Sequence, residues 1–157
     1  MSEIVPARTK ADLDAVKTLF REYVDDLEFE LDFQDFDAEL KDFPGKYGPP
    51  TGALLLAKLD GLPVGVVGLR DLGDGFCEMK RLYLRPAARG TGLGSRLVDA
   101  VIAEGRRLGY QAMRLDTVTD AQPRAIEIYL ARGFREIEPY CFNPLPTATF
   151  LELDLSR

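Results

Sequence analysis

Three glycines at alternate positions, Gly90, Gly92 and Gly94, open an amphipathic stretch directly after a strand-like run. Glycine lets a backbone adopt positive φ angles and approach a bulky ligand closely. Successive backbone N–H groups at such a turn form a concave set of donors, and the dipole of a following helix adds partial positive charge. The turn is flanked by three arginines, Arg85, Arg89 and Arg96. The stretch therefore predicts an anion site, and a pyrophosphate is its natural ligand.

Two familiar nucleotide-binding loops do not fit this turn. The P-loop ends in Gly-Lys-Ser/Thr, whereas Gly94, Ser95 and Arg96 stand here. The dinucleotide fingerprint G-x-G-x-x-G fails because Ser95 takes the place of its last glycine. Three spaced glycines alone leave a second reading open, a plain turn at the start of a helix.

The side chains available for acid–base chemistry are restricted, because the chain contains no histidine. Ser-His-Asp and Cys-His mechanisms are thereby excluded. The two cysteines, Cys77 and Cys141, form no C-x-x-C pair, so we expect no metal site. Either cysteine could in principle be a nucleophile, although buried thiols are common. Acid–base steps must use Glu, Asp, Tyr, Lys, Cys or water.

Charge is unevenly distributed along this acidic chain, whose formal net charge is −6. Residues 22–42 contain ten Asp or Glu and one Lys, whereas residues 76–135 are net basic. Two readings stay open, solvated faces or an acidic rim and a basic region that select ligands. The acidic balance argues against nucleic-acid binding. No apolar run or leader-like N-terminus suggests a membrane or secretion, so we expect a cytoplasmic protein.

The apolar periodicity predicts one domain over residues 1–157, with a mixed sheet and helices on its faces. A β-α-β unit around the glycine turn predicts two parallel strands. In strand 76–84, alternation would put Glu78 on the same side as Lys80, Leu82 and Leu84. The predicted strands cover residues 3–8, 53–59, 64–69, 76–84, 113–118, 134–137 and 149–155, and the predicted helices cover 11–31, 36–40, 93–108 and 121–132.

Two motifs resemble those of the Gcn5-related N-acetyltransferase (GNAT) family. Arg89-x-x-Gly92-x-Gly94 after a strand ending in LYLRP resembles the family's acetyl-coenzyme A motif. AIEIY, ending at Tyr129, followed by Gly133-Phe134, resembles its second signature. The predicted element order over residues 3–155 matches as well. The resemblance implies an α/β (α+β) fold with a centrally splayed, mixed sheet, and an acetyl-CoA cosubstrate.

The resemblance also implies where the carrier binds. The strand at Leu82–Leu84 would diverge from the strand at 113–118, and the pantetheine arm would pair with its exposed backbone. One departure is Gln122, because the family often has Asn at that position. The implied carrier-binding residues are Leu82, Tyr83, Leu84, Arg89, Gly90, Thr91, Gly92, Leu93, Gly94, Ser95, Gln122 and Tyr129.

The family resemblance assigns catalytic roles to Tyr129 and Glu78. Tyr129 matches the acid that protonates the departing thiolate, and an unperturbed tyrosine is protonated at neutral pH. Glu78 matches the base that takes the amine proton in some members, although it could instead pair with Lys80 or an arginine. Backbone N–H groups near Leu82–Leu84 could stabilise the oxyanion.

The acceptor is expected to lie at Glu78, Tyr140, Phe142 and Asn143, beside the acidic stretch. We therefore expect direct transfer of acetyl to a primary amine of a small acceptor, with cationic amines favoured by the acidic residues. Alternatives are a non-catalytic acyl-CoA sensor, a protein amine acceptor, or another acyl group. The chain could be a monomer or a homodimer.

Overall fold

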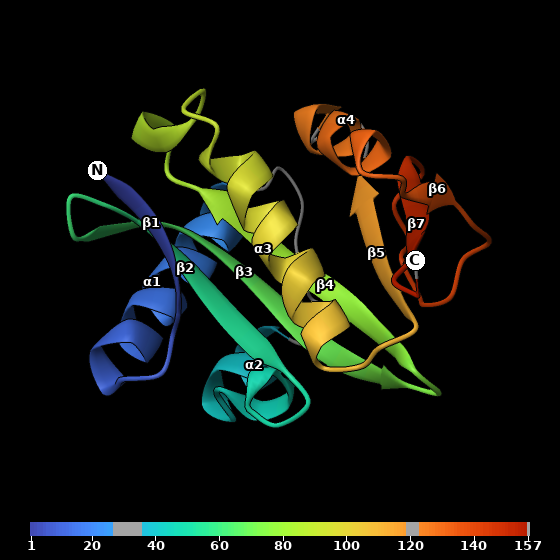
Figure 1. Cartoon of the computed structure of the whole chain (residues 1–157), viewed down its shortest axis with the longest axis horizontal. Coiled ribbons are helices and arrows are strands. Elements are labelled where there is room, and N and C mark those ends of the chain that lie inside the picture. Colours follow the sequence, from blue (N-terminus) through green and yellow to red (C-terminus); the bar gives the residue numbers. More distant parts are fainter. Residues whose placement is uncertain (27–35, 119–122, 157) are drawn as a thin grey trace.

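A seven-stranded sheet with helices on both faces forms the protein (Figure 1). The computed structural model describes residues 1–26, 36–118 and 123–156. The strands are β1 (Ser2–Pro6), β2 (Ala53–Leu59), β3 (Leu62–Gly73), β4 (Phe76–Leu84), β5 (Ala112–Val118), β6 (Arg135–Glu136) and β7 (Ala148–Asp154). The helices are α1 (Lys10–Asp26), α2 (Phe36–Lys41), α3 (Leu93–Arg107) and α4 (Pro123–Ala131), with 3-10 turns at Gly45–Tyr47 and Pro86–Ala88.

The predicted element order and fold class are confirmed. The turn at Asp60 and Gly61 joins β2 to β3, where both residues have positive φ, as a tight hairpin requires. The β3 strand is longer than predicted, since its pairing with β4 continues to Gly73. The predicted end of the first helix and the first two residues of the last helix lie outside the described residues.

The sheet has the order β1-β2-β3-β4-β5-β7-β6, and among the described strands β4–β5 is the one parallel pair. Helix α3 connects these two strands, which confirms the predicted β-α-β unit. Their pairing covers only Phe76–Ala112, Cys77–Met113 and Glu78–Arg114. Beyond Glu78, β4 and β5 diverge (Figure 1), so the sheet is splayed at its centre as expected.

Two apolar clusters lie on opposite faces of the sheet. Helices α3 and α4 cover one face, where Leu97, Val101 and Met113 are fully buried. Helix α1 covers the other face, where Phe20 packs against Tyr47 with ring centroids 5.7 Å apart. The splay therefore lies between two packed layers that hold its strands in place.

A bulge in β4 overturns the predicted alternation of that strand. Val66 pairs with Tyr83 but Gly68 pairs with Lys80, so two β4 residues oppose one of β3. Arg81 in this bulge has φ +62°. Leu82 and Leu84 therefore face the α3 cluster together with Met79. Glu78 lies on the opposite face from Leu82 and Leu84, and the prediction that they share a side is wrong.

Within residues 1–26, 36–118 and 123–156, none of the helices is both long and apolar enough to cross a bilayer.

Candidate active site at the splay

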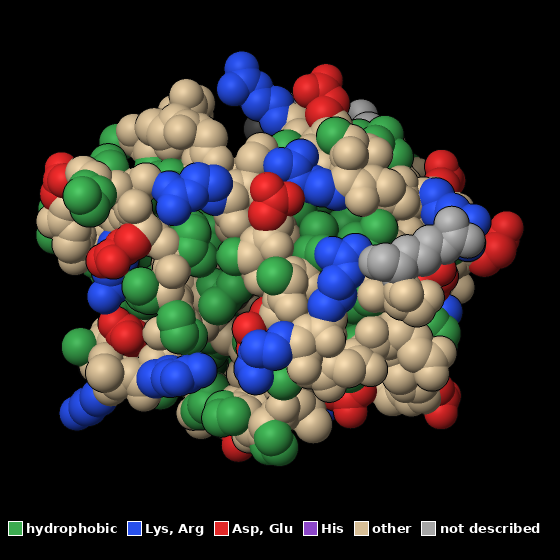
Figure 2. All heavy atoms as spheres, viewed as in Figure 1, with side chains coloured by type: hydrophobic (Ala, Val, Ile, Leu, Met, Phe, Trp, Pro, Cys, Tyr) green, Lys and Arg blue, Asp and Glu red, His purple; other side chains and the backbone are tan. Residues whose placement is uncertain are grey.

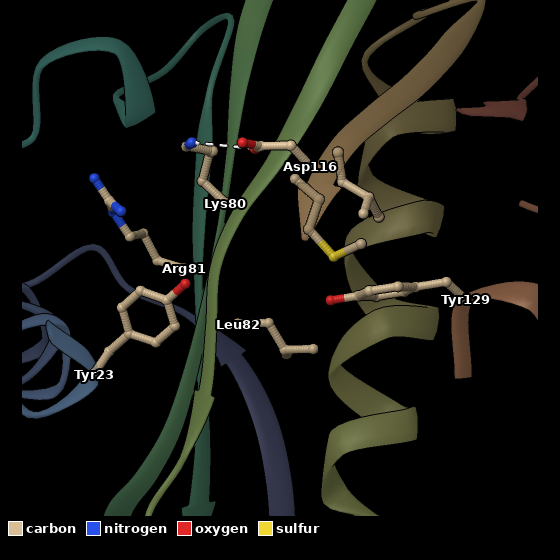
Figure 3. Close-up of a pocket in the computed structure, with 8 residues that line it drawn as sticks. Tyr23, Lys80, Arg81, Leu82, Asp116 and Tyr129 are labelled. Atoms are coloured by element: carbon tan, nitrogen blue, oxygen red, sulfur yellow. Dashed lines mark ion pairs between the residues drawn. The ribbon is translucent and has the colours of Figure 1, made fainter. Parts of the chain in front are cut away.

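The diverging ends of β4 and β5 enclose a cavity (Figure 3). Helix α1 contributes Tyr23 to its wall and helix α4 contributes Tyr129, so both faces of the sheet reach this cavity. The remaining lining residues come from the two strands: Met79, Lys80, Arg81, Leu82, Leu115 and Asp116.

Tyr129 is a buried side chain whose hydroxyl faces this cavity. Its oxygen lies on the side of the ring toward β4 (Figure 3), and it makes no hydrogen bond to any described residue. Phe134 of the second motif packs on the Tyr129 ring, with ring centroids 5.7 Å apart. This contact explains why the motif combines the tyrosine with a following Gly-Phe. Burial raises the pKa of Tyr129, and nearby Tyr23 and Asp116 raise it further. The group therefore stays protonated and can act as a proton donor.

The glycine turn presents unpaired backbone donors at the start of α3. Gly90 and Gly92 have φ +79° and +84°, and Gly92 is the N-cap without a side-chain capping bond. The first helical bond joins the Arg96 N–H to the Gly92 carbonyl (3.2 Å). Among the described residues, no acceptor binds the amides of residues 90–95. An anion could satisfy these donors.

The arginines around the turn have different partners. Arg85 donates to both carboxylate oxygens of Glu22, at 2.9 and 2.8 Å, and thereby ties β4 to α1. Arg89 is exposed, donates to the Leu84 carbonyl (3.0 Å) and lies over the Tyr83 ring. Figure 2 shows Lys and Arg interspersed with Asp and Glu over the α3 face. The predicted anion site therefore rests on backbone amides rather than on a basic patch.

The turn lies beside the splay. A Cβ built on Gly94 would be 3.3 Å from Leu84 of β4 and 3.9 Å from Ile128, the neighbour of Tyr129 in α4. Leu82 and Leu84 are half-buried, and beyond Glu78 their strand has no described partner on the β5 side. Thr91 and Ser95 belong to the same turn, whereas Gln122 lies outside the described residues.

Glu78 is buried and fully engaged by hydrogen bonds. It is 1% exposed, and its two oxygens accept bonds from Arg70 Nε (2.7 Å) and the Tyr140 hydroxyl (2.6 Å). Burial and the nearby Glu78 charge raise the pKa of Tyr140, which therefore remains a donor. The predicted acceptor residue Tyr140 is thus brought directly against Glu78.

Asp116 is a second carboxylate at the splay, and the sequence analysis missed it. Its oxygens lie 3.0 Å from Asn143 Nδ2 and 3.6 Å from Lys80 Nζ. The predicted acceptor residue Asn143 therefore reaches the cavity wall, whereas Phe142 is 72% exposed at the surface. The sequence does contain a signal for Asp116. The alternation of β5 places this residue on the face opposite the apolar side chains of Met113 and Leu115.

The two cysteines contribute little chemical reactivity here, and residues 27–35 of the acidic stretch lie outside the described part of the chain. Burial is the main cause that raises the pKa of Cys77 to about 12 and that of Cys141 to about 11, so both remain thiols. Glu22 binds Arg85, and Glu39 binds Arg81 at 3.3 Å. These two acidic residues are therefore engaged in ion pairs rather than forming an open rim.

Comparison with known proteins identifies the family. The sequence profile described as "Acetyltransferase (GNAT) family" matches residues 14–134. A Schizosaccharomyces pombe protein named as an N-acetyltransferase is 42% identical over 148 residues, which cover 93% of this chain and 90% of the relative.

Solved structures agree with this assignment. An acyl-CoA N-acyltransferase from Klebsiella pneumoniae has a TM-score of 0.73 and 28% identity over 99% of this chain and 98% of that one. An acetyltransferase from Salmonella typhimurium, solved with acetyl-CoA, shares the fold with a TM-score of 0.70 and 23% identity over 98% and 94% of the chains. The chain therefore belongs to the GNAT family of acetyltransferases.

Proposed function

We propose that this protein transfers the acetyl group of acetyl-CoA directly to the primary amine of a small acceptor. One observation carries the proposal: the Tyr129 hydroxyl, without a described partner, faces a splay whose mouth adjoins a turn of unpaired amides. The S. pombe relative is named as an N-acetyltransferase and the Salmonella structure contains acetyl-CoA, which supports the chemistry.

The turn side of the splay, residues 82–95, is here named the carrier side. Its free amides fit a pyrophosphate, and the edge of β4 beyond its pairing with β5 fits the amide groups of a pantetheine arm. The residues proposed to hold the carrier are Leu82, Tyr83, Leu84, Arg89, Gly90, Thr91, Gly92, Leu93, Gly94 and Ser95, with Gln122 and Tyr129. Bound there, the carrier supplies an activated acetyl thioester.

Transfer to an amine needs an acid for the sulfur, a base for the nitrogen and donors for the oxyanion. Tyr129 is the proposed acid, because its raised pKa keeps its proton available. Backbone N–H groups near Leu82–Leu84 are the proposed oxyanion donors. The role of Glu78 as the base remains a prediction. Both oxygens of this carboxylate already accept short hydrogen bonds.

The opposite side of the splay, formed by Glu78, Asp116, Tyr140, Cys141 and Asn143, is here named the acceptor side. Tyr140 and Asn143 reach it through their bonds to the two carboxylates. Phe142 lies on the same loop and is proposed to cover the bound acceptor. Ammonium-bearing acceptors remain favoured, because the carboxylate of Asp116 lines the cavity, whereas Glu22 and Glu39 are held in ion pairs with arginines.

The test is an amine panel with acetyl-CoA, followed by release of free thiol and mass analysis of the product. The panel should contain a polyamine, an aminoglycoside, lysine and an N-terminal peptide. We expect amine-dependent thiol release with stoichiometric acetylation of the amine. Tight acetyl-CoA binding without turnover of any amine would contradict an enzyme and favour the sensor alternative.

A further inference from the structure

Two carboxylates occupy the acceptor side, but only one of them lines the cavity. Asp116 belongs to the cavity wall together with Tyr129, whereas Glu78 does not. Figure 3 shows the Asp116 carboxylate beside Lys80 near the upper end of the same hollow that Tyr129 faces. Asp116 and the proposed acid Tyr129 therefore line one and the same cavity.

The two carboxylates also differ in how strongly their oxygens are held. Glu78 has a charged donor at 2.7 Å and a hydroxyl donor at 2.6 Å, and is almost inaccessible. Asp116 has a neutral amide donor at 3.0 Å and an ammonium at 3.6 Å, which is longer than a hydrogen bond. The Asp116 oxygen near Lys80 is the one that can gain a better donor.

Lys80 and an acceptor amine carry the same chemical group. Lys80 Nζ is an ammonium with three donors, and its side chain lines the same cavity wall as Asp116. A ligand ammonium that replaces it beside Asp116 keeps the buried carboxylate compensated. The charged and titratable groups near Asp116 are Glu78, Lys80 and Arg81 of β4, Tyr140 and Cys141 of the loop before β7, Tyr23 of α1 and Tyr129 of α4.

We propose that Asp116 is the residue that binds the acceptor's ammonium group and takes its proton, with Lys80 as the resident cation that the acceptor displaces. This proposal rests on the proposed transfer to an amine. Glu78 then has a positioning role, since it fixes the Tyr140 hydroxyl at the edge of the site.

The proton balance of this step is simple. One N–H bond of the ammonium breaks, its electron pair remains on nitrogen, and an O–H bond forms on Asp116. The neutral amine can then attack the thioester carbonyl. The nitrogen loses its second proton to water as the C–N bond forms and the C–S bond breaks, and Tyr129 supplies one proton to the leaving sulfur. Both residues return to their starting states by exchange with water, and one proton is released per turnover.

The first experiment compares Asp116→Asn with Glu78→Gln, using an amine that the wild type acetylates. We expect kcat/KM for the amine to fall roughly 10²- to 10⁴-fold in Asp116→Asn, the usual range for loss of a general base. Acetyl-CoA affinity, measured by calorimetry, should stay at the wild-type value and shows that the variant is folded. Wild-type kcat/KM in Asp116→Asn, or a larger loss in Glu78→Gln, would overturn the proposal.

The second experiment removes the cation beside each carboxylate and leaves both carboxylates in place. A carboxylate that loses a nearby cation is protonated more easily. In Lys80→Met, the low-pH limb of kcat/KM should therefore move to higher pH, and it should move further than in the matched Arg70→Met, whose guanidinium pairs with Glu78. Movement with Arg70→Met alone, or with neither variant, would overturn the proposal even if Asp116→Asn fails to fold.

The outcomes also separate this proposal from the function on which it rests. No turnover of any amine by the wild type contradicts both. Wild-type turnover with unimpaired Asp116→Asn contradicts the role of Asp116 alone.

Discussion

On the carrier side of the splay the ligand-facing groups are backbone amides, whereas on the acceptor side they are charged side chains that hold one another. The amides of residues 90–95 depend on the left-handed backbone at Gly90 and Gly92. The acceptor side depends on the pairs Arg70–Glu78 and Lys80–Asp116.

The two sides of the splay therefore differ in the ligands that they can recognise. Backbone amides suit an invariant pyrophosphate, because any sequence with the right turn presents them. A network of side chains can change its ligand when one residue changes. In the proposed function, the carrier side therefore holds the acetyl donor and the acceptor side selects the substrate.

The largest expected effect is on the carrier side. Gly92→Asp places a negative side chain at a position with φ +84° and open space around it. Repulsion of the pyrophosphate should lower acetyl-CoA affinity at least about 100-fold in calorimetry, the scale of a few kcal/mol for a misplaced charge. The matched control is Gly73→Asp, with φ +89° and equally open space in the β3–β4 turn. Equal affinity losses in both variants would remove the turn from the carrier site.

The next effect lies where the two sides meet. Tyr129→Phe should lower kcat roughly 10²- to 10⁴-fold, because it removes the proposed acid. The fold should remain, since the hydroxyl leaves no described partner unsatisfied, and kcat should fall much more than acetyl-CoA affinity. Because the pKa of Tyr129 is raised, this hydroxyl stays protonated in the wild type. The pH profile of wild-type kcat should therefore show no alkaline decrease from Tyr129 below about pH 10. An unchanged kcat in the phenylalanine variant would exclude the role.

A smaller effect is expected from Tyr140→Phe on the acceptor side. Loss of the 2.6 Å bond to buried Glu78 should cost about 1–3 kcal/mol of unfolding free energy, measured with urea. The KM for the amine should rise while acetyl-CoA affinity stays the same. Tyr110→Phe, which loses an exposed bond to the Thr51 carbonyl, is the control. A stability loss no larger than in that control would show that Tyr140 does not hold Glu78.

The smallest effect is expected from Cys141→Ala. With its pKa raised to about 11, the thiol is largely protonated near neutral pH, and direct transfer does not use it. We expect kcat within about twofold of the wild type, because a protonated thiol is a poor nucleophile and the proposed transfer needs none. A large loss of kcat, or acetyl found on Cys141 by mass spectrometry, would replace direct transfer by a covalent route.

The turn and the strands of the carrier side were largely predictable from sequence. On the acceptor side the sequence predicted Glu78, Tyr140 and Asn143, but it did not reveal Asp116 or the bulge in β4. Glycine spacing marks a turn because backbone conformation is a local property, and the helix start and parallel strands followed from it. No comparable sequence signal indicates the bulge at Arg81. The residue is not glycine, and its φ of +62° follows from the pairing of β4 with β3. Asp116 could be placed on a face of β5, but its neighbours Lys80 and Asn143 come from distant parts of the chain.

The central claim is that carrier and acceptor meet at one splay for direct transfer. Its most direct test is the ratio of free thiol released to amine acetylated, with intact-mass analysis of the protein during turnover. We predict one thiol per acetylated amine, no acetyl on the protein, and loss of both products in Tyr129→Phe. Acetyl-CoA binding without any amine-dependent thiol release would contradict the account.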